Sequence, residues 1–157
     1  MPAPRVALGT HLDPLGPDEL ALWERYRELA EAAGPSELVV TKSRFTFKAP
    51  QRNFTGGFFK SRRLEIFFDL PSPIPERGRD ARFRDVWQHS RTIWVHRLKI
   101  ERVEELDEQL AGWLREAWLR TRSPPRSARD APGRTVARMR DEALWWLADD
   151  ERGGAGG

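Results

Sequence analysis

The stretch NFTGGFFKSRRLEIFFDL, residues 53–70, alternates apolar and polar side chains as β-strands do. In its second half, four large apolar side chains share one face: Leu64, Ile66, Phe68 and Leu70. The other face carries Glu65, Phe67 and Asp69. The pattern predicts two antiparallel strands joined by a basic turn, with one apolar face that must be covered.

Gly56 and Gly57 interrupt the first of these two strands. Glycine inside a strand pattern marks a bulge or a close approach of another backbone. We expect a bulge here, and the alternative is a gap that faces a ligand.

The alternation continues on both sides of this hairpin. Residues 37–49, ELVVTKSRFTFKA, are predicted as a first strand with Phe45 and Phe47 on one face. Residues 92–100, TIWVHRLKI, are predicted as a fourth strand, after a long Arg-rich loop over residues 75–90. These segments predict a four-stranded antiparallel meander.

Two segments have helical spacing of their apolar residues. Residues 18–33 end at Gly34-Pro35, and residues 103–121 begin with acidic residues and end with arginines, as the helix dipole favours. The fold class is therefore α+β, with helices packed on one face of the sheet.

The chain is divided by composition into five parts. We expect an irregular lead-in at 1–17, a domain at 18–121, a Pro/Arg-rich linker at 122–133, an appended amphipathic helix at 134–150 and a disordered tail at 151–157.

Composition excludes several classes of protein. The chain has no cysteine, which rules out disulfides, thiol catalysis and metal sites with cysteine ligands. It has neither the apolar run of a signal peptide nor a stretch of roughly 20 apolar residues that could cross a membrane. We expect a cytoplasmic protein without a membrane partner.

Three sequence words, ELVVTKSRFTFKAPQRNF, RRLEIFFDLP and WVHRLKIERVEELDEQLAGWLREAW, resemble the DUF5655 family of bacterial domains. The resemblance covers roughly residues 18–121. It implies a compact α+β domain of unknown function, with no established reaction or catalytic residues. The paired glycines depart from the pattern of that family, and residues 134–150 lie outside it.

Basic residues concentrate on the first strand and on the turns beside it. The candidate contacts for an anion or a nucleic acid are Lys42, Arg44, Lys48, Arg52, Lys60, Arg62 and Arg63. Such residues also occur on solvated faces and on blunted sheet edges, so both interpretations remain open. Acids on the third strand are expected to pair with Arg97 or Lys99 across the sheet.

A second group of residues could line a pocket: Trp94, His96, Gly56, Gly57 and Phe67. His96 shares an apolar face with Trp94, which favours a semi-buried structural histidine. The three histidines lack metal-ligand spacing, so no cofactor or metal is expected.

Three functions are consistent with the sequence. The first is a small non-enzymatic binding or accessory module that uses the basic sheet edge and the loop over residues 75–90. The alternative is a sequence-tolerant nucleic-acid-binding domain, and the third is an enzyme that uses His96 with Asp69 or Glu65. Expected partners are a nucleic acid or an acidic protein. The helix at 134–150 would dock on its own domain or form a homodimer.

Overall fold

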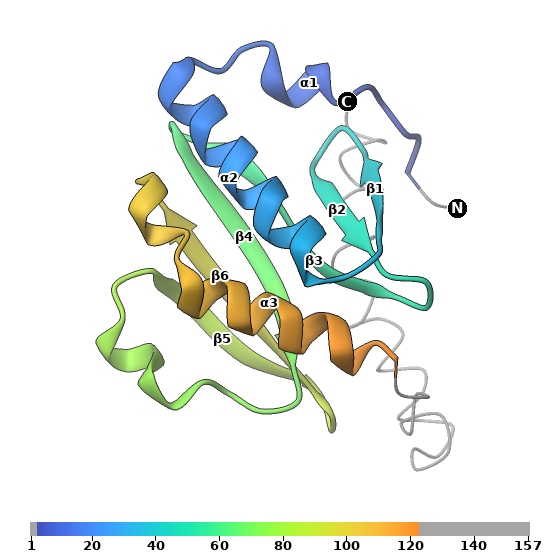
Figure 1. Cartoon of the computed structure of the whole chain (residues 1–157), viewed down its shortest axis with the longest axis vertical. Coiled ribbons are helices and arrows are strands. Elements are labelled where there is room, and N and C mark those ends of the chain that lie inside the picture. Colours follow the sequence, from blue (N-terminus) through green and yellow to red (C-terminus); the bar gives the residue numbers. More distant parts are fainter. Residues whose placement is uncertain (1–2, 123–157) are drawn as a thin grey trace.

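The computed structural model describes residues 3–122, which form a sheet with helices on one of its faces (Figure 1). The helices are α1 (Gly9–Leu12), α2 (Pro17–Ala33) and α3 (Glu108–Arg120), with short 3-10 turns η1 (Pro75–Arg79) and η2 (Val103–Glu105). The strands are β1 (Glu37–Val40), β2 (Phe45–Lys48), β3 (Asn53–Lys60), β4 (Arg63–Leu70), β5 (Phe83–Ser90) and β6 (Ile93–Ile100).

The sheet is antiparallel and has the strand order β1-β2-β3-β4-β6-β5. The α+β class agrees with the sequence, but the prediction of a four-stranded meander is wrong because the sheet has six strands. β4 pairs with β6 rather than with the strand that follows it, so β5 lies at the outer edge.

The first additional strand comes from residues 37–49, which form a β-hairpin instead of one strand. Val40 pairs with Phe45, and the Thr41 amide donates to the Arg44 carbonyl at 2.9 Å to close the turn. The predicted basic edge strand is therefore not formed: Lys42 and Arg44 lie in or beside the turn, and the outer strand β1 carries no basic residue. The turn was missed because the sequence TKSR contains no glycine, proline or Asn-Gly signal.

The second additional strand is β5, within the predicted loop over residues 75–90. Only Pro75–Arg79 and the residues just after it remain outside the sheet, so this segment is not the long binding loop that was expected. Register shifts between Phe83 and Asp85 and between Gln88 and Ser90 break the alternation of its side chains. Those two irregularities hid the strand from a search for period two.

The core lies between α2, α3 and one face of the sheet (Figure 1). Trp23 of α2 packs against Phe45 with ring centroids 4.6 Å apart. The buried Tyr26 hydroxyl and Thr55 Oγ1 are 2.9 Å apart, and the Thr55 hydroxyl donates to the Phe67 carbonyl at 2.7 Å. This chain of hydrogen bonds joins α2 to the two central strands.

Gly56 and Gly57 lie in a regular part of β3, where they pair with Phe67 and Ile66 of β4. The register shift in this region lies between Phe47 and Lys48 of β2, because Phe47 pairs with Thr55 and Lys48 pairs with Asn53. A Cβ on Gly57 would overlap the Glu65 carbonyl oxygen, and one on Gly56 would lie 2.8 Å from the Phe45 carbonyl oxygen. The glycines therefore permit close packing of neighbouring strands, and the expected bulge at the glycines is not found.

Within residues 3–122, no helix combines the length and apolar composition needed to cross a membrane. The predicted linker, appended helix, tail and homodimer contact lie outside the described residues, apart from Arg122. The predicted division of the chain into parts stays a prediction.

Candidate functional site

The sheet face turned away from α2 and α3, called the open face below, carries an apolar cluster of its own. Phe67 of β4 is 1% exposed and Val95 of β6 is 0% exposed. Three partly buried side chains pack against them: Phe58, Trp87 and Ile93. The open face is thus more apolar than a solvated sheet face.

A buried carboxylate lies beside this cluster. Glu65 is fully buried and accepts from three guanidinium groups, Arg97 at 2.7 Å, Arg84 at 3.1 Å and Arg63 at 3.2 Å. Burial raises the pKa of Glu65, but the hydrogen bond and charge of Arg97, with Arg84 and Arg63, outweigh burial and hold the pKa below its ordinary value. The expected cross-strand pairing of Glu65 with Arg97 is present. Arg63 also donates to Glu65, so this candidate contact residue is engaged inside the protein.

The predicted contact residues do not form one surface. Lys42, Arg44, Lys60, Arg62 and Arg63 lie at the end of the sheet where β2 and β4 begin and β3 ends, while Lys48 and Arg52 lie at the opposite end.

Within the first group, Arg44 is buried with its guanidinium 5.1 Å from the centre of the Phe67 ring. Lys42, Lys60 and Arg62 are exposed. Ser61 and Arg62 have φ angles of 52° and 64°, a left-handed turn built without glycine.

At the opposite end, Asp69 brings basic side chains together. The positive charges of Arg120 and Arg52 both act on Asp69, and the charge of Arg52 also acts on Arg120. Arg120 Nε donates to the carbonyl of Thr92, in the β5–β6 turn that also contains Arg91, and Lys48 pairs with Asn53 next to Arg52. We call Arg52, Asp69 and Arg120 the Asp69 cluster; Lys48 and Arg91 lie at the same end of the sheet.

The Asp69 cluster holds strongly perturbed ionisable groups. Burial raises the pKa of Asp69 from 3.8 to about 7, although Arg120 and Arg52 oppose the shift. Burial lowers the pKa of Arg120, an effect that Asp69 opposes and Arg52 adds to. Asp69 Oδ1 and Arg120 Nη1 are both shielded from solvent, and neither has a hydrogen-bond partner among residues 3–122. An anion between them would satisfy Arg120, and a protonated Asp69 could donate to that anion.

His96 is enclosed on the opposite face of the sheet. Its Nε2 accepts from the Ile74 amide at 3.1 Å, its Nδ1 lies 3.1 Å from the Trp94 carbonyl oxygen, and its ring stacks on Phe68 at 5.2 Å. Burial lowers the pKa of His96 to about 4, so the ring is neutral at physiological pH. Both ring nitrogens are occupied by hydrogen bonds within the core.

The predicted pocket residues are split between the two faces. The strand pairing places Trp94, His96 and Gly57 on the face toward the helices, and Gly56 and Phe67 on the open face. Glu65 and Asp69 are also on the open face, so the fold does not bring His96 together with either acid. In the described part of the chain, no group of three or more His, Cys, Asp or Glu side chains could hold a metal ion.

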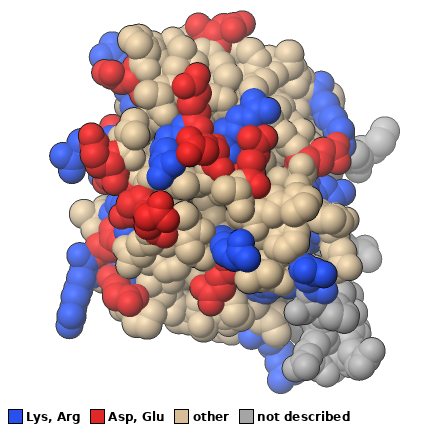
Figure 2. Space-filling view, in the orientation of Figure 1, with Lys and Arg blue, Asp and Glu red and all other residues tan. Residues whose placement is uncertain are grey.

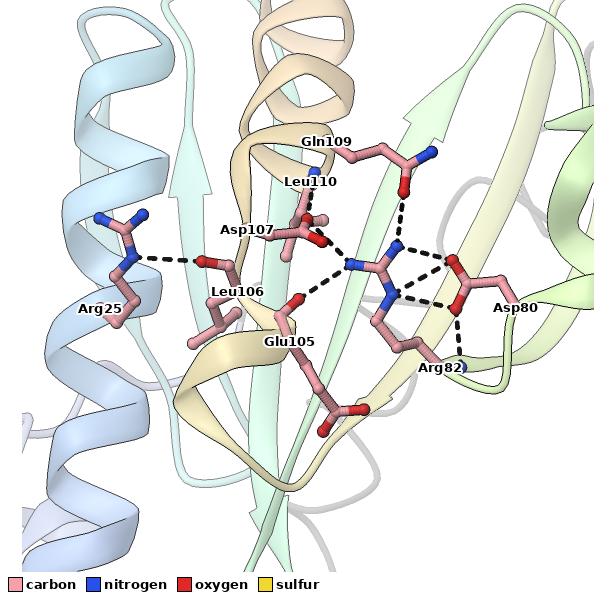
Figure 3. A network of polar contacts seen from close by, with 8 residues as sticks. All are labelled: Arg25, Asp80, Arg82, Glu105, Leu106, Asp107, Gln109 and Leu110. Atoms are coloured by element: carbon pink, nitrogen blue, oxygen red, sulfur yellow. Dashed lines mark hydrogen bonds and ion pairs between the residues drawn. The ribbon is translucent and has the colours of Figure 1, made fainter.

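Arg82 forms a dense polar network, which was not predicted from the sequence (Figure 3). Its guanidinium donates to Asp80, to the Glu105 carbonyl, to Asp107 and to Gln109 at 2.6–3.2 Å. Its charge also lies 5.2 Å from the centre of the Trp113 ring. These contacts give all three nitrogens of the guanidinium an acceptor, so Arg82 is a structural clamp between the start of β5 and the start of α3.

The side of the molecule covered by helices shows acidic and basic residues interspersed (Figure 2). Several of them are paired along α2, as in Arg25–Glu28 at 2.9 Å and Arg27–Glu31 at 3.3 Å. No single sign of charge dominates this view, which leaves the Asp69 cluster as the better candidate site.

The comparisons with known proteins find no family model, no curated protein and no solved structure that matches this chain. The resemblance to the DUF5655 family therefore stays a prediction.

Proposed function

We propose that this protein is a non-enzymatic binding module that takes an anionic partner at the Asp69 cluster. The observation that carries the proposal is the approach of Arg52 and Arg120 to one half-buried acid, Asp69, whose pKa is raised to about 7. An ordinary carboxylate would neutralise one of these arginines. Asp69 is partly protonated at neutral pH and so neutralises less of the charge of Arg120.

The chemistry of the cluster favours oxygen anions such as phosphate or carboxylate. A guanidinium presents a planar fork of donors that matches two oxygens of such a group. Arg120 Nη1 is shielded and has no hydrogen-bond partner in the described part of the chain, which is costly unless a ligand or water supplies one.

A nucleic-acid strand is the more specific candidate partner. Six arginines against one acid, Asp130, occur between residues 122 and 140, and this segment follows directly after the Asp69 cluster. Phe67 is buried, so the open face offers no free ring at that position on which a base could stack. Contacts would be made to the phosphate backbone, which predicts sequence-tolerant and salt-dependent binding.

The test is binding of the full chain to labelled single-stranded and duplex DNA and RNA, with polyglutamate as an anion without phosphate. We expect nucleic-acid affinity to fall steeply as salt rises from about 50 to about 200 mM. The variant Lys48→Ala/Arg52→Ala should weaken binding and lower the salt slope by roughly 0.9 for each phosphate that the protein no longer neutralises.

The matched control is Lys42→Ala/Lys60→Ala, which removes the same charge at the other end of the sheet. It should leave most of the affinity intact. Equal losses in both double variants would assign binding to net charge rather than to the cluster and would overturn the site. Binding of polyglutamate alone would replace nucleic acid by an acidic protein, and binding of no polyanion would overturn the proposed function.

A further inference from the structure

The open face carries an apolar cluster and a buried carboxylate, and no helix within the described residues packs on them. Residues 3–122 place α2 and α3 on the other face and no helix on this one (Figure 1). Yet Phe67 and Val95 are 1% and 0% exposed, and the carboxylate of Glu65 is 0% exposed.

We infer that the open face is the docking site of this chain's own C-terminal segment, residues 134–150. The segment has helical spacing of apolar residues: Val136, Met139, Ala143, Trp146 and Leu147. A helix over these residues would be about 26 Å long. That length matches β4, whose Arg63–Leu70 span of about 26 Å runs through the centre of the apolar cluster.

The end of the described chain is placed for this docking. α3 ends at Arg120, which donates to the Thr92 carbonyl in the β5–β6 turn at one end of the sheet. Residues 123–133 can span at most about 40 Å, which is enough to pass around that end and reach the open face. A tether this short gives the segment a high effective concentration, which favours its own domain over a second molecule.

Charge also fits this occupant. The open face carries five basic residues, Arg44, Arg63, Arg84, Arg97 and Lys99, against three acids, Glu65, Asp69 and Asp85. Residues 134–150 contain four acids and three arginines, and all four acids lie in the half that carries the two adjacent tryptophans, residues 141–150, which has no basic residue. Docking of this half on an apolar surface with a basic excess would combine apolar burial with complementary charge.

The experiment uses the full chain, which contains no cysteine. A nitroxide is attached to Ala148→Cys, which lies outside the apolar stripe of the segment, and the indole N–H signals of the tryptophans are recorded by NMR. We expect the label to broaden the Trp87 signal on the open face and to leave the Trp23 signal of α2 unchanged. Samples are diluted with unlabelled protein so that only contacts within one chain contribute.

Two variants test the face of the segment that docks. Trp146→Asp, on the stripe, should abolish broadening of the Trp87 signal, and Trp145→Asp, on the opposite side of the same helix, should keep it. Retained Trp23, Trp113 and Trp118 signals show that the domain stays folded in either variant.

Three outcomes would overturn the inference. One is no broadening of the Trp87 signal in the parent, and another is equal broadening in both variants. The third is broadening only when the nitroxide and the NMR isotope are on different chains, which would assign the open face to a second copy. None of these outcomes depends on whether the Asp69 cluster binds an anion.

Discussion

Gly57 shows at the scale of one residue how tightly the central strands are packed. Its missing side chain leaves the space that the Glu65 carbonyl oxygen occupies on β4. The sequence identified the two glycines as unusual, but it could not distinguish a bulge from a close approach, because that depends on the partner strand. A ligand-facing gap would have left open space at this position.

Gly57→Ala is expected to lower the free energy of unfolding by about 1–3 kcal/mol, because the added methyl group must push two paired strands apart. Urea unfolding followed by tryptophan fluorescence measures the change. Gly112→Ala is the control: nothing lies within 4 Å of a Cβ at Gly112 in α3, so this change should stabilise the protein by up to about 1 kcal/mol. A neutral Gly57→Ala would contradict the assigned close packing.

Some candidate residues could be placed from the pattern along one strand, and others depend on contacts between distant segments. The sequence correctly placed Phe45, Phe68 and His96 on the face toward the helices, because alternation along one strand settles that question. It could not assemble the Asp69 cluster. Arg52, Asp69 and Arg120 come from three separate segments, and only the folded chain brings them together.

At the scale of the element, β5 is held by a side chain that precedes it. Arg82 joins Asp80 to the start of α3 through Asp107, which also caps that helix by accepting from the Leu110 amide at 3.0 Å (Figure 3). The side chain of Arg82 is 9% exposed, so its removal leaves acceptors with little access to water.

Arg82→Met keeps the apolar stem and removes the guanidinium. We expect a loss of about 3–5 kcal/mol in the free energy of unfolding, because breaking a buried ion pair leaves the other partners unpaired. Hydrogen exchange should quicken in β5 and in the first turn of α3 before it does so in β3 and β4. The matched change Arg79→Met, at an exposed arginine of η1, should alter stability by less than about 0.5 kcal/mol. Similar losses for both variants would refute the role of Arg82 as a clamp.

Predictability at this scale followed the regularity of each element. α2, β4 and α3 have unbroken periodicity, and the sequence located them. The β1–β2 turn and β5 were missed, the first because TKSR has no turn residue and the second because two register shifts disturb its alternation. The Arg82 clamp also has no local signature beyond an acid two positions before the arginine.

The whole molecule combines acids whose pKa values are shifted in opposite directions. Glu65 and Asp80 have lowered pKa values, and the main cause at Asp80 is the hydrogen bond from Arg82. These two carboxylates therefore stabilise the folded state above their unfolded pKa values, and this stabilisation is lost in acid. Asp69 has a raised pKa of about 7, so the folded state binds more protons than the unfolded chain between about pH 4 and pH 7. Its contribution therefore makes folding less favourable as the pH rises through that range.

We expect stability to peak at mildly acidic pH, near about pH 5, and to decline on both sides. Asp69→Asn should raise the free energy of unfolding at about pH 8 by more than about 1 kcal/mol and flatten the decline above pH 5, without changing the acid limb. Urea unfolding across the pH range measures both limbs. A decline above pH 5 that persists unchanged in Asp69→Asn would show that another group causes it.

Both outer edges of the sheet limit how this protein can associate with others. The edge strand β1 is short, and the Val6 amide already donates to the Val40 carbonyl at 2.9 Å, while Arg5 bridges Thr41. The other edge, β5, is interrupted by its two register shifts. Neither edge presents a long, regular row of free backbone groups, so growth of the sheet by strand addition is blocked at both sides. Concentrated solutions should therefore resist fibril formation, and at the edges of this sheet recognition through side chains is favoured over backbone pairing.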